Sequence, residues 1–166
     1  DGVADTDGPC TRAEIFAVFA RLAATLATND QLLVFTTDHG AQITNTHAVL
    51  NLWNAEELHD YELEALTTNL PCPVMFVMEQ CYSGGFVDNL DQPQRVITTA
   101  ADYEHPSWAG DTWPGYNQYV YYWTAAIRGF FPGRHPWEDG FACDADANRD
   151  GFVSFKEATD FALGNA

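Results

Sequence analysis

VMFVMEQCYSGG, residues 74–85, begins as an apolar run and ends on a glutamate, a cysteine and two glycines. QLLVFTTDHG, residues 31–40, is built in the same way and ends on Asp38, His39 and Gly40. Short, nearly continuous apolar runs are typical of strands that are covered on both faces of a parallel sheet. The two stretches therefore predict two buried parallel strands, each ending on chemically active residues.

Helical patterns surround these strands. Thr11 and Glu14 predict a capping box at the start of an amphipathic helix over residues 11–27. Asn54 and Glu57 predict a cap before a second helix, so that the order strand, helix, strand forms a βαβ unit. Further along the chain, the pattern predicts a third strand at residues 95–100 and an aromatic-rich helix at residues 116–128.

The composition limits the class of protein. The chain has 166 residues, 46% of them hydrophobic and 14% aromatic, which suits one folded domain and excludes disorder. Its formal net charge is -17, with Lys156 as the single lysine. That charge disfavours nucleic acid and anionic membranes as partners and favours cations or basic peptides. No apolar run approaches the about 20 residues of a membrane span, so no membrane partner is expected.

The two strand ends predict a catalytic site. In an open parallel sheet, ligands bind beyond the carboxyl ends of the strands, which is where His39 and Cys81 are expected. A thiol beside an imidazole is a nucleophile with its acid/base. The N–H groups of Gly40 and Cys81 would stabilise an oxyanion, while Gly84 and Gly85 would keep the approach to the thiol open. The alternative is a redox or structural thiol.

The same residues resemble a known family. VFTTDHG followed by VMFVMEQCYSGGF resembles the His-Gly and Glu-x-Cys blocks of the caspase-like (clan CD) cysteine peptidases, closest to the legumain family. VITTAAD, residues 96–102, resembles the legumain strand that follows the cysteine, whereas the caspase signature Q-A-C-x-G is not matched. The resemblance implies an α/β fold, a caspase-like three-layer α/β/α sandwich around a mainly parallel sheet. It also implies hydrolysis of peptides or proteins through a Cys81 thioester, with His39 as acid/base.

The resemblance also suggests a specificity. Glu79 matches a position that in the family lies beside the pocket for the residue before the cut. A carboxylate there disfavours an acidic side chain, so we predict cleavage after Arg, Lys or Asn. The alternative is that Glu79 only accepts hydrogen bonds from the backbone. Ser107 matches a substrate-binding position of legumain loosely. The remaining histidines, His105 among them, are expected on the surface or in loops.

The chain also departs from the family. Two strands and a helix of the family precede the segment where this chain begins, so we expect an incomplete sheet and a fragment of a longer precursor. The missing N-terminal portion would then be a partner, as a separate chain. The alternative function is a catalytically inactive homologue that acts as a calcium-dependent binding module. The acidity favours a secreted bacterial protein. With Cys81 set aside, at most one disulfide can form, and its pair stays open among Cys10, Cys72 and Cys143.

DADANRDGFVSFKE, residues 144–157, fits the calcium loop of an EF-hand, with Gly151 at the sharp turn. The expected ligands are side-chain or backbone oxygens of Asp146, Asn148, Asp150, Phe152, Ser154 and Glu157. A weaker copy at residues 1–14 includes Asp5, Asp7, Gly8 and Glu14 but has Val3 at the first ligand position, so it is expected to bind poorly. We expect a peptidase domain over residues 1–140, with the calcium loop and C-terminal helix, 141–166, packed on it in a structural role.

Overall fold

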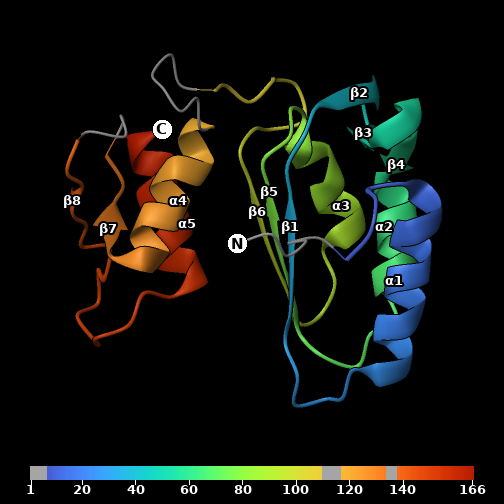
Figure 1. The fold of residues 1–166 in the computed structure, drawn as a ribbon, viewed down its shortest axis with the longest axis horizontal. Helices are drawn as coiled ribbons and strands as arrows, with labels where there is room; N and C mark the ends of the chain where they lie inside the picture. Colours follow the sequence, from blue (N-terminus) through green and yellow to red (C-terminus); the bar gives the residue numbers. More distant parts are fainter. Residues whose placement is uncertain (1–6, 110–116, 134–137) are drawn as a thin grey trace. The chain divides into compact units, whose positions relative to one another are not determined.

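The computed structural model describes residues 7–109, 117–133 and 138–166. The chain forms two compact units, Asp1–Pro106 and Ser107–Ala166, and each is described by itself (Figure 1). The segment of the expected calcium loop lies in the second unit. Asp5 and Val3 of the weaker copy lie outside the described residues.

A parallel sheet forms the centre of the first unit. Its strand order is β1-β5-β6, with β1 at Leu32–Thr36, β5 at Val74–Met78 and β6 at Arg95–Thr99. Both pairings are parallel. Three helices lie on one side of this sheet (Figure 1): α1 at Arg12–Thr25, α2 at Asp60–Thr67 and α3 at Val87–Leu90. The expected α/β fold, a parallel sheet flanked by helices, is confirmed, as are the three predicted strands.

A small antiparallel sheet, which the sequence did not predict, follows β1. It consists of β2 (Gly40–Thr44), β3 (His47–Asn51) and β4 (Glu57–His59), with the short helix η1 (Trp53–Ala55) before β4. The second helix consequently begins later than expected, because residues 57–59 are paired as a strand. Its N-cap is His59, which forms a capping box with Glu62 in place of the predicted cap at Asn54.

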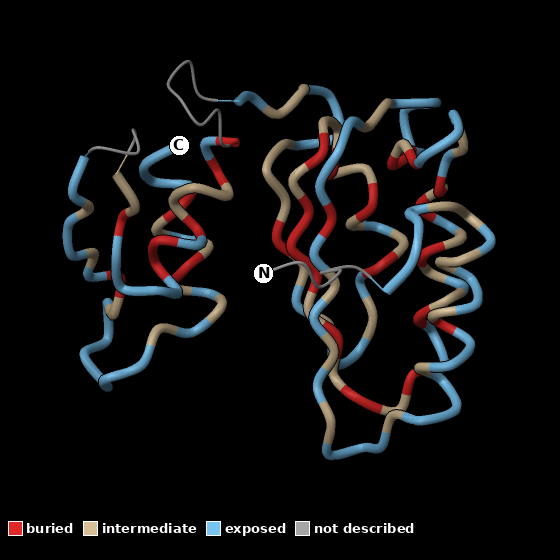
Figure 2. Tube along the Cα trace, in the orientation of Figure 1, coloured by how far each residue is buried: buried red, intermediate tan, exposed pale blue. Residues whose placement is uncertain are grey.

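The core of the first unit lies between the sheet and the three helices. Its buried members include Phe19 of α1, Leu63 of α2, Phe76 of β5 and Leu90 of α3. Figure 2 shows buried residues along the strands of this unit and on the facing sides of its helices. The strand β5 is buried throughout its centre, as predicted. In contrast, β1 alternates and leaves Leu33 and Phe35 exposed.

The start of α1 confirms half of the predicted capping box. The Thr11 hydroxyl accepts a hydrogen bond of 3.4 Å from the Glu14 N–H. The Glu14 side chain lies beside Gly8, where an added Cβ would be 3.0 Å from its Cγ, and its carboxylate pairs with Arg21. The helix is therefore capped by the threonine side chain, while the glutamate contacts the segment before the helix.

In the part that the structure describes, the second unit is built from two helices and a short hairpin. Its elements are α4 at Gln118–Arg128, β7 at Phe130–Phe131, β8 at Phe141–Ala142 and α5 at Phe155–Asn165. Aromatic side chains join them: Trp123 meets Phe155 at a ring-centroid distance of 5.3 Å, and Phe131 meets Phe141 at 4.7 Å. Among the described helices of either unit, none has the length and apolar character to cross a membrane.

Candidate active site

His39 and Cys81 follow neighbouring strands at the same edge of the parallel sheet. The last residues of β1 and β5, Thr36 and Met78, are direct partners in the register. The pairing continues one step further, because the Glu79 N–H donates a hydrogen bond of 2.9 Å to the Thr36 carbonyl. The two strand-end loops therefore lie side by side, as the sequence predicted.

The loop after β1 that carries His39 is called the histidine loop, and the loop after β5 that carries Cys81 is called the cysteine loop. Gly40 brings the two loops into direct contact. A Cβ built on Gly40 would lie 2.4 Å from the Cys81 carbonyl oxygen and 3.0 Å from that of Val49. No side chain fits at these distances, so glycine is required here for a close approach of the backbone. At this contact His39 is exposed and Cys81 is half-buried.

The first pairs of the hairpin direct the Gly40 N–H. The Asn51 N–H donates to the His39 carbonyl over 2.9 Å, and the following pair in the antiparallel register is Gly40 with Leu50. Hydrogen-bonded and non-hydrogen-bonded pairs alternate in such a ladder. The Gly40 N–H consequently points away from β3, toward the edge of β2 that is not paired with β3.

The residue before the histidine has an unusual backbone conformation. Asp38 has a φ of 153°, which side-chain-bearing residues rarely adopt, and its carboxylate accepts a hydrogen bond of 2.6 Å from the His39 N–H. Local strain of this kind is concentrated at functional sites. The thiol of Cys10 lies near the same carboxylate: burial and then the Asp38 charge raise the pKa of Cys10 above its usual value.

A third loop, whose contact with the cysteine loop the sequence did not indicate, follows β6 and bonds to the backbone of the cysteine loop. The Tyr82 N–H donates to the His105 carbonyl over 3.0 Å, and the Gly84 N–H donates to the Ala101 carbonyl over 2.9 Å. The Ser83 hydroxyl accepts a hydrogen bond from the Ala101 N–H. This loop follows β6, the third parallel strand, so the rule that located the other two loops also points to it.

Asp102 gives this third loop its shape. Its carboxylate accepts hydrogen bonds from the N–H groups of Glu104 and His105 and contacts the His105 Nδ1 at 2.8 Å. The Glu104 N–H first, and His105 second, hold the pKa of Asp102 below its usual value. His105 is exposed, as predicted, but its backbone belongs to the wall of the candidate site.

Gly84 and Gly85 have a packing role that the sequence did not indicate. An added Cβ on Gly84 would lie 2.7 Å from the Asp102 backbone, and one on Gly85 would lie 2.7 Å from the Ala48 Cβ. Both glycines therefore allow close packing of the cysteine loop against its neighbours, and that they also keep the approach to the thiol open stays a prediction.

Comparison with known proteins shows the family to which this chain belongs. The sequence model described as "Peptidase C13 family" matches residues 21–124, a range that contains β1, β5, β6 and all three loops. The chain belongs to the peptidase C13 family. A solved structure, protein GSU0716 from Geobacter sulfurreducens, shares the fold with a TM-score of 0.54 at 15% identity, over 87% of this chain and 77% of that one. No curated protein gives a significant match.

In this C13 chain, the residues predicted to bind substrate lie in different units. Glu79 directly follows β5 and is half-buried, with its N–H bonded to Thr36. Ser107 is the first residue of the second unit, so its position is described only within that unit. Their roles in substrate binding stay predictions.

The predicted calcium loop of the C13 chain has a defined backbone. Asp146 accepts hydrogen bonds from the N–H groups of Asp150 and Gly151, and Gly151 has a φ of 91°. Glu157 accepts from the N–H groups of Asn148 and Ser154, and the Ser154 N–H foremost holds the pKa of Glu157 below its usual value. Over the described residues, no group of three or more His, Cys, Asp or Glu side chains is gathered as for a metal ion.

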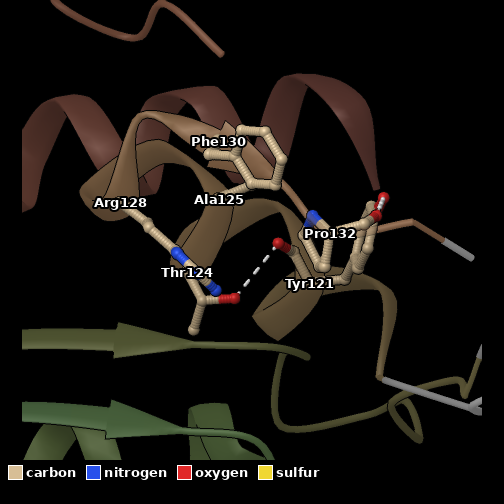
Figure 3. A pocket seen from close by; sticks show the side chains of 6 residues that line it. All are labelled: Tyr121, Thr124, Ala125, Arg128, Phe130 and Pro132. Carbon is tan, nitrogen blue, oxygen red and sulfur yellow. Dashed lines mark hydrogen bonds between the residues drawn. The ribbon is translucent and has the colours of Figure 1, made fainter. Parts of the chain in front are cut away.

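A small cavity of about 160 Å³ lies in the second unit. Figure 3 shows its lining at the end of α4, where Arg128 and Phe130 border it, and the Tyr121 hydroxyl donates to the Pro132 carbonyl. Its volume is below the about 300 Å³ at which ligand pockets begin. The candidate active site is the meeting point of the three strand-end loops in the first unit, because the Gly40 contact and the hydrogen bonds of Tyr82 and Gly84 join these loops there.

Proposed function

We propose that this member of the C13 family is a cysteine endopeptidase in which Cys81 is the nucleophile and His39 the acid/base. The observation that carries the proposal is the contact of Gly40 with the Cys81 carbonyl, since it joins the two loops that bear these groups. Membership in the family supports a function of the cysteine-peptidase type.

The chemistry follows from the two side chains. The His39 imidazole takes the proton of the Cys81 thiol, and the thiolate attacks the carbonyl carbon of the scissile bond, forming a C–S bond. The oxyanion that results would accept hydrogen bonds from the N–H groups of Gly40 and Cys81. The C–N bond then breaks, the amine leaves with the proton from His39, and water hydrolyses the thioester and restores the thiol.

We expect the enzyme to cleave after Arg, Lys or Asn. Carboxylates border the three loops: Asp38 precedes His39, Glu79 precedes Cys81 by two positions, and Asp102 lies in the third loop. Such a set of negative charges attracts basic side chains and disfavours acidic ones. Preferred turnover of a peptide with Asp before the cut would contradict this specificity.

The function is tested by alkylation of Cys81 with iodoacetamide. Cys10 and Cys143 also carry thiols, whose pKa values are raised by burial and by Asp38 or Asp144. The assay therefore uses a Cys10→Ser, Cys143→Ser background and locates the label by mass spectrometry. Labelling of Cys81 that slows strongly in His39→Ala, together with peptide hydrolysis that is lost in Cys81→Ala, is expected. Labelling indifferent to His39 would favour the alternative, an inactive homologue.

We also propose that residues 146–157 bind calcium in a structural role. The proposal is supported by the left-handed Gly151 at the predicted turn and by the oxygen-rich residues at alternate positions. Calcium would draw the carboxylates of Asp146 and Glu157 together, and binding to the folded state alone would raise stability. The secreted bacterial setting expected from the acidity stays a prediction.

A further inference from the structure

Gln80 is a buried polar side chain between the two proposed catalytic loops. It lies between Glu79 and Cys81, and 0% of its surface is exposed. Its Oε1 accepts a hydrogen bond of 2.7 Å from the Thr36 hydroxyl. Because Thr36 is the last residue of β1, this bond joins the ends of the two strands that carry His39 and Cys81.

Gln80 also contacts the far end of the histidine loop. A Cβ built on Gly40 would lie 2.8 Å from the Gln80 Cγ, so the aliphatic part of Gln80 packs directly against Gly40. The segment 37–39, which carries His39, is therefore held at its first end through Thr36 and at its second end through Gly40. One side chain contacts both ends of this segment.

The amide of Gln80 is incompletely paired. Its Nε2 is buried and has no hydrogen-bond partner among the described residues. A half-turn of the amide would only exchange the two atoms, because Nε2 would then donate to the Thr36 hydroxyl and Oε1 would be left unpaired. A buried unpaired polar atom destabilises the folded state, and an apolar side chain of the same length would avoid this cost. Gln80 is thus unfavourable for stability at a position that contacts both loops.

We propose that Gln80 is a positioning residue, which acts through Thr36 and Gly40 to hold the His39 loop against the Cys81 loop. The proposal rests on the proposed function of His39 and Cys81. Buried polar contacts fix geometry at the expense of stability, and at a catalytic pair a displacement of about 1 Å lowers the rate by about 100-fold. Loss of the amide should therefore reduce catalysis without reducing stability.

The variant Gln80→Met separates the two effects, since methionine has a similar length and flexibility but no amide. We expect kcat to fall by about 10- to 100-fold with little change in KM, while the melting temperature stays constant or rises. Gln31→Met, an exposed glutamine before β1, is the matched control and should change neither quantity. A lower melting temperature with an unchanged kcat would overturn the proposal, because this is the result expected if Gln80 has only a structural role.

The hydrogen bond to Thr36 gives a second, independent test. Thr36→Val removes the hydroxyl at nearly constant shape, and we expect a similar fall in kcat. The double variant Thr36→Val, Gln80→Met should lose no more activity than either single variant, because both remove the same contact. Losses that multiply in the double variant would show that Gln80 does not act through Thr36 and would overturn the proposal.

The rate of Cys81 alkylation over a range of pH separates failure of this proposal from failure of the proposed function. If wild-type labelling depends on His39 and Gln80→Met removes that dependence, both proposals stand. If the dependence survives in Gln80→Met, only the role of Gln80 is overturned. If wild-type labelling does not depend on His39, the proposed function is overturned, and the role of Gln80 with it.

Discussion

Gly40 lies so close to Cys81 that a Cβ added to the glycine would be 2.4 Å from the cysteine carbonyl oxygen. A second carbonyl, that of Val49, lies 3.0 Å from the same position. Both obstacles are backbone atoms, which cannot move aside as the end of a flexible side chain can. The histidine loop and the cysteine loop are therefore fitted to each other at this glycine.

Gly40→Ala should separate these loops. We expect peptidase activity and His39-dependent alkylation of Cys81 to fall by about 100-fold, because the imidazole is displaced from the thiol. Gly164→Ala is the control, since nothing lies within 4 Å of an added Cβ there and alanine favours the helix. Kinetics and thermal unfolding of the two variants measure the contrast. Full activity of Gly40→Ala would show that the contact does not matter.

Asp60 is a buried carboxylate that anchors the small antiparallel sheet to α2. It is 0% exposed and accepts hydrogen bonds from the N–H groups of Ala48 and Tyr61 at 3.1 and 2.7 Å. The variant Asp60→Ala leaves these donors unpaired and should lower the free energy of unfolding by about 3 kcal/mol. His47→Ala, which removes the half-exposed partner of the same carboxylate, should cost less than about 1 kcal/mol. Urea unfolding compares the two.

The stability that Asp102 gives to the folded state, through the loop after β6, should be lost in acid. The pKa of Asp102 is lowered in the folded state, by the Glu104 N–H first. Its contribution to stability is therefore present above the unfolded pKa of about 3.9 and is lost as the pH falls through the lower folded value. Asp102→Asn should unfold at a lower temperature than the wild type at pH 6, and the difference should shrink toward pH 3. A difference that is constant with pH would exclude this carboxylate as the cause.

The strands, and the positions of His39 and Cys81 at their ends, were predictable because the signals are local. Continuous apolar runs marked β1 and β5, and the geometry of a parallel sheet requires their ends to meet. The hairpin β2–β3 was missed because β2 is largely exposed, so no buried face imposes a pattern on the sequence of this first strand. The pairing of β4 with β3 then displaced the start of α2 to Asp60.

The remaining parts of the candidate site depend on contacts between distant segments. Nothing local distinguishes Gln80, whose burial follows from its packing against Gly40 and Thr36. His105 was assigned to the surface, and its side chain is exposed, but its carbonyl receives the Tyr82 N–H. Sequence patterns predict side-chain chemistry, whereas such backbone contacts are set only when the loops pack.

Calcium should stabilise the protein through residues 146–157. We expect excess chelator to lower the melting temperature of the wild type and calcium to restore it, since a ligand of the folded state shifts unfolding by mass action. Asp146→Ala should remove the response, and Asp160→Ala, an exposed acid outside the predicted ligands, should keep it. A wild-type transition that does not respond to chelator would contradict a structural calcium site.

Glu79 is expected to determine the specificity of cleavage, because it lies between the end of β5 and Cys81. If its carboxylate faces the side chain before the cut, Glu79→Gln should lower kcat/KM for Arg and Lys peptides by about 10-fold, the effect of losing about 1.4 kcal/mol of charge attraction. Peptides with Asn should be cleaved as before, since an amide gains little from the charge. Glu104→Gln removes an exposed acid from the neighbouring loop and is the control for the overall negative charge around the site. It should change kcat/KM for Arg and Lys peptides only weakly. An equal loss of kcat/KM for all peptides in Glu79→Gln would contradict this role, and would mean that the carboxylate supports the backbone. The preference for basic side chains would then come from the other acidic residues around the three loops.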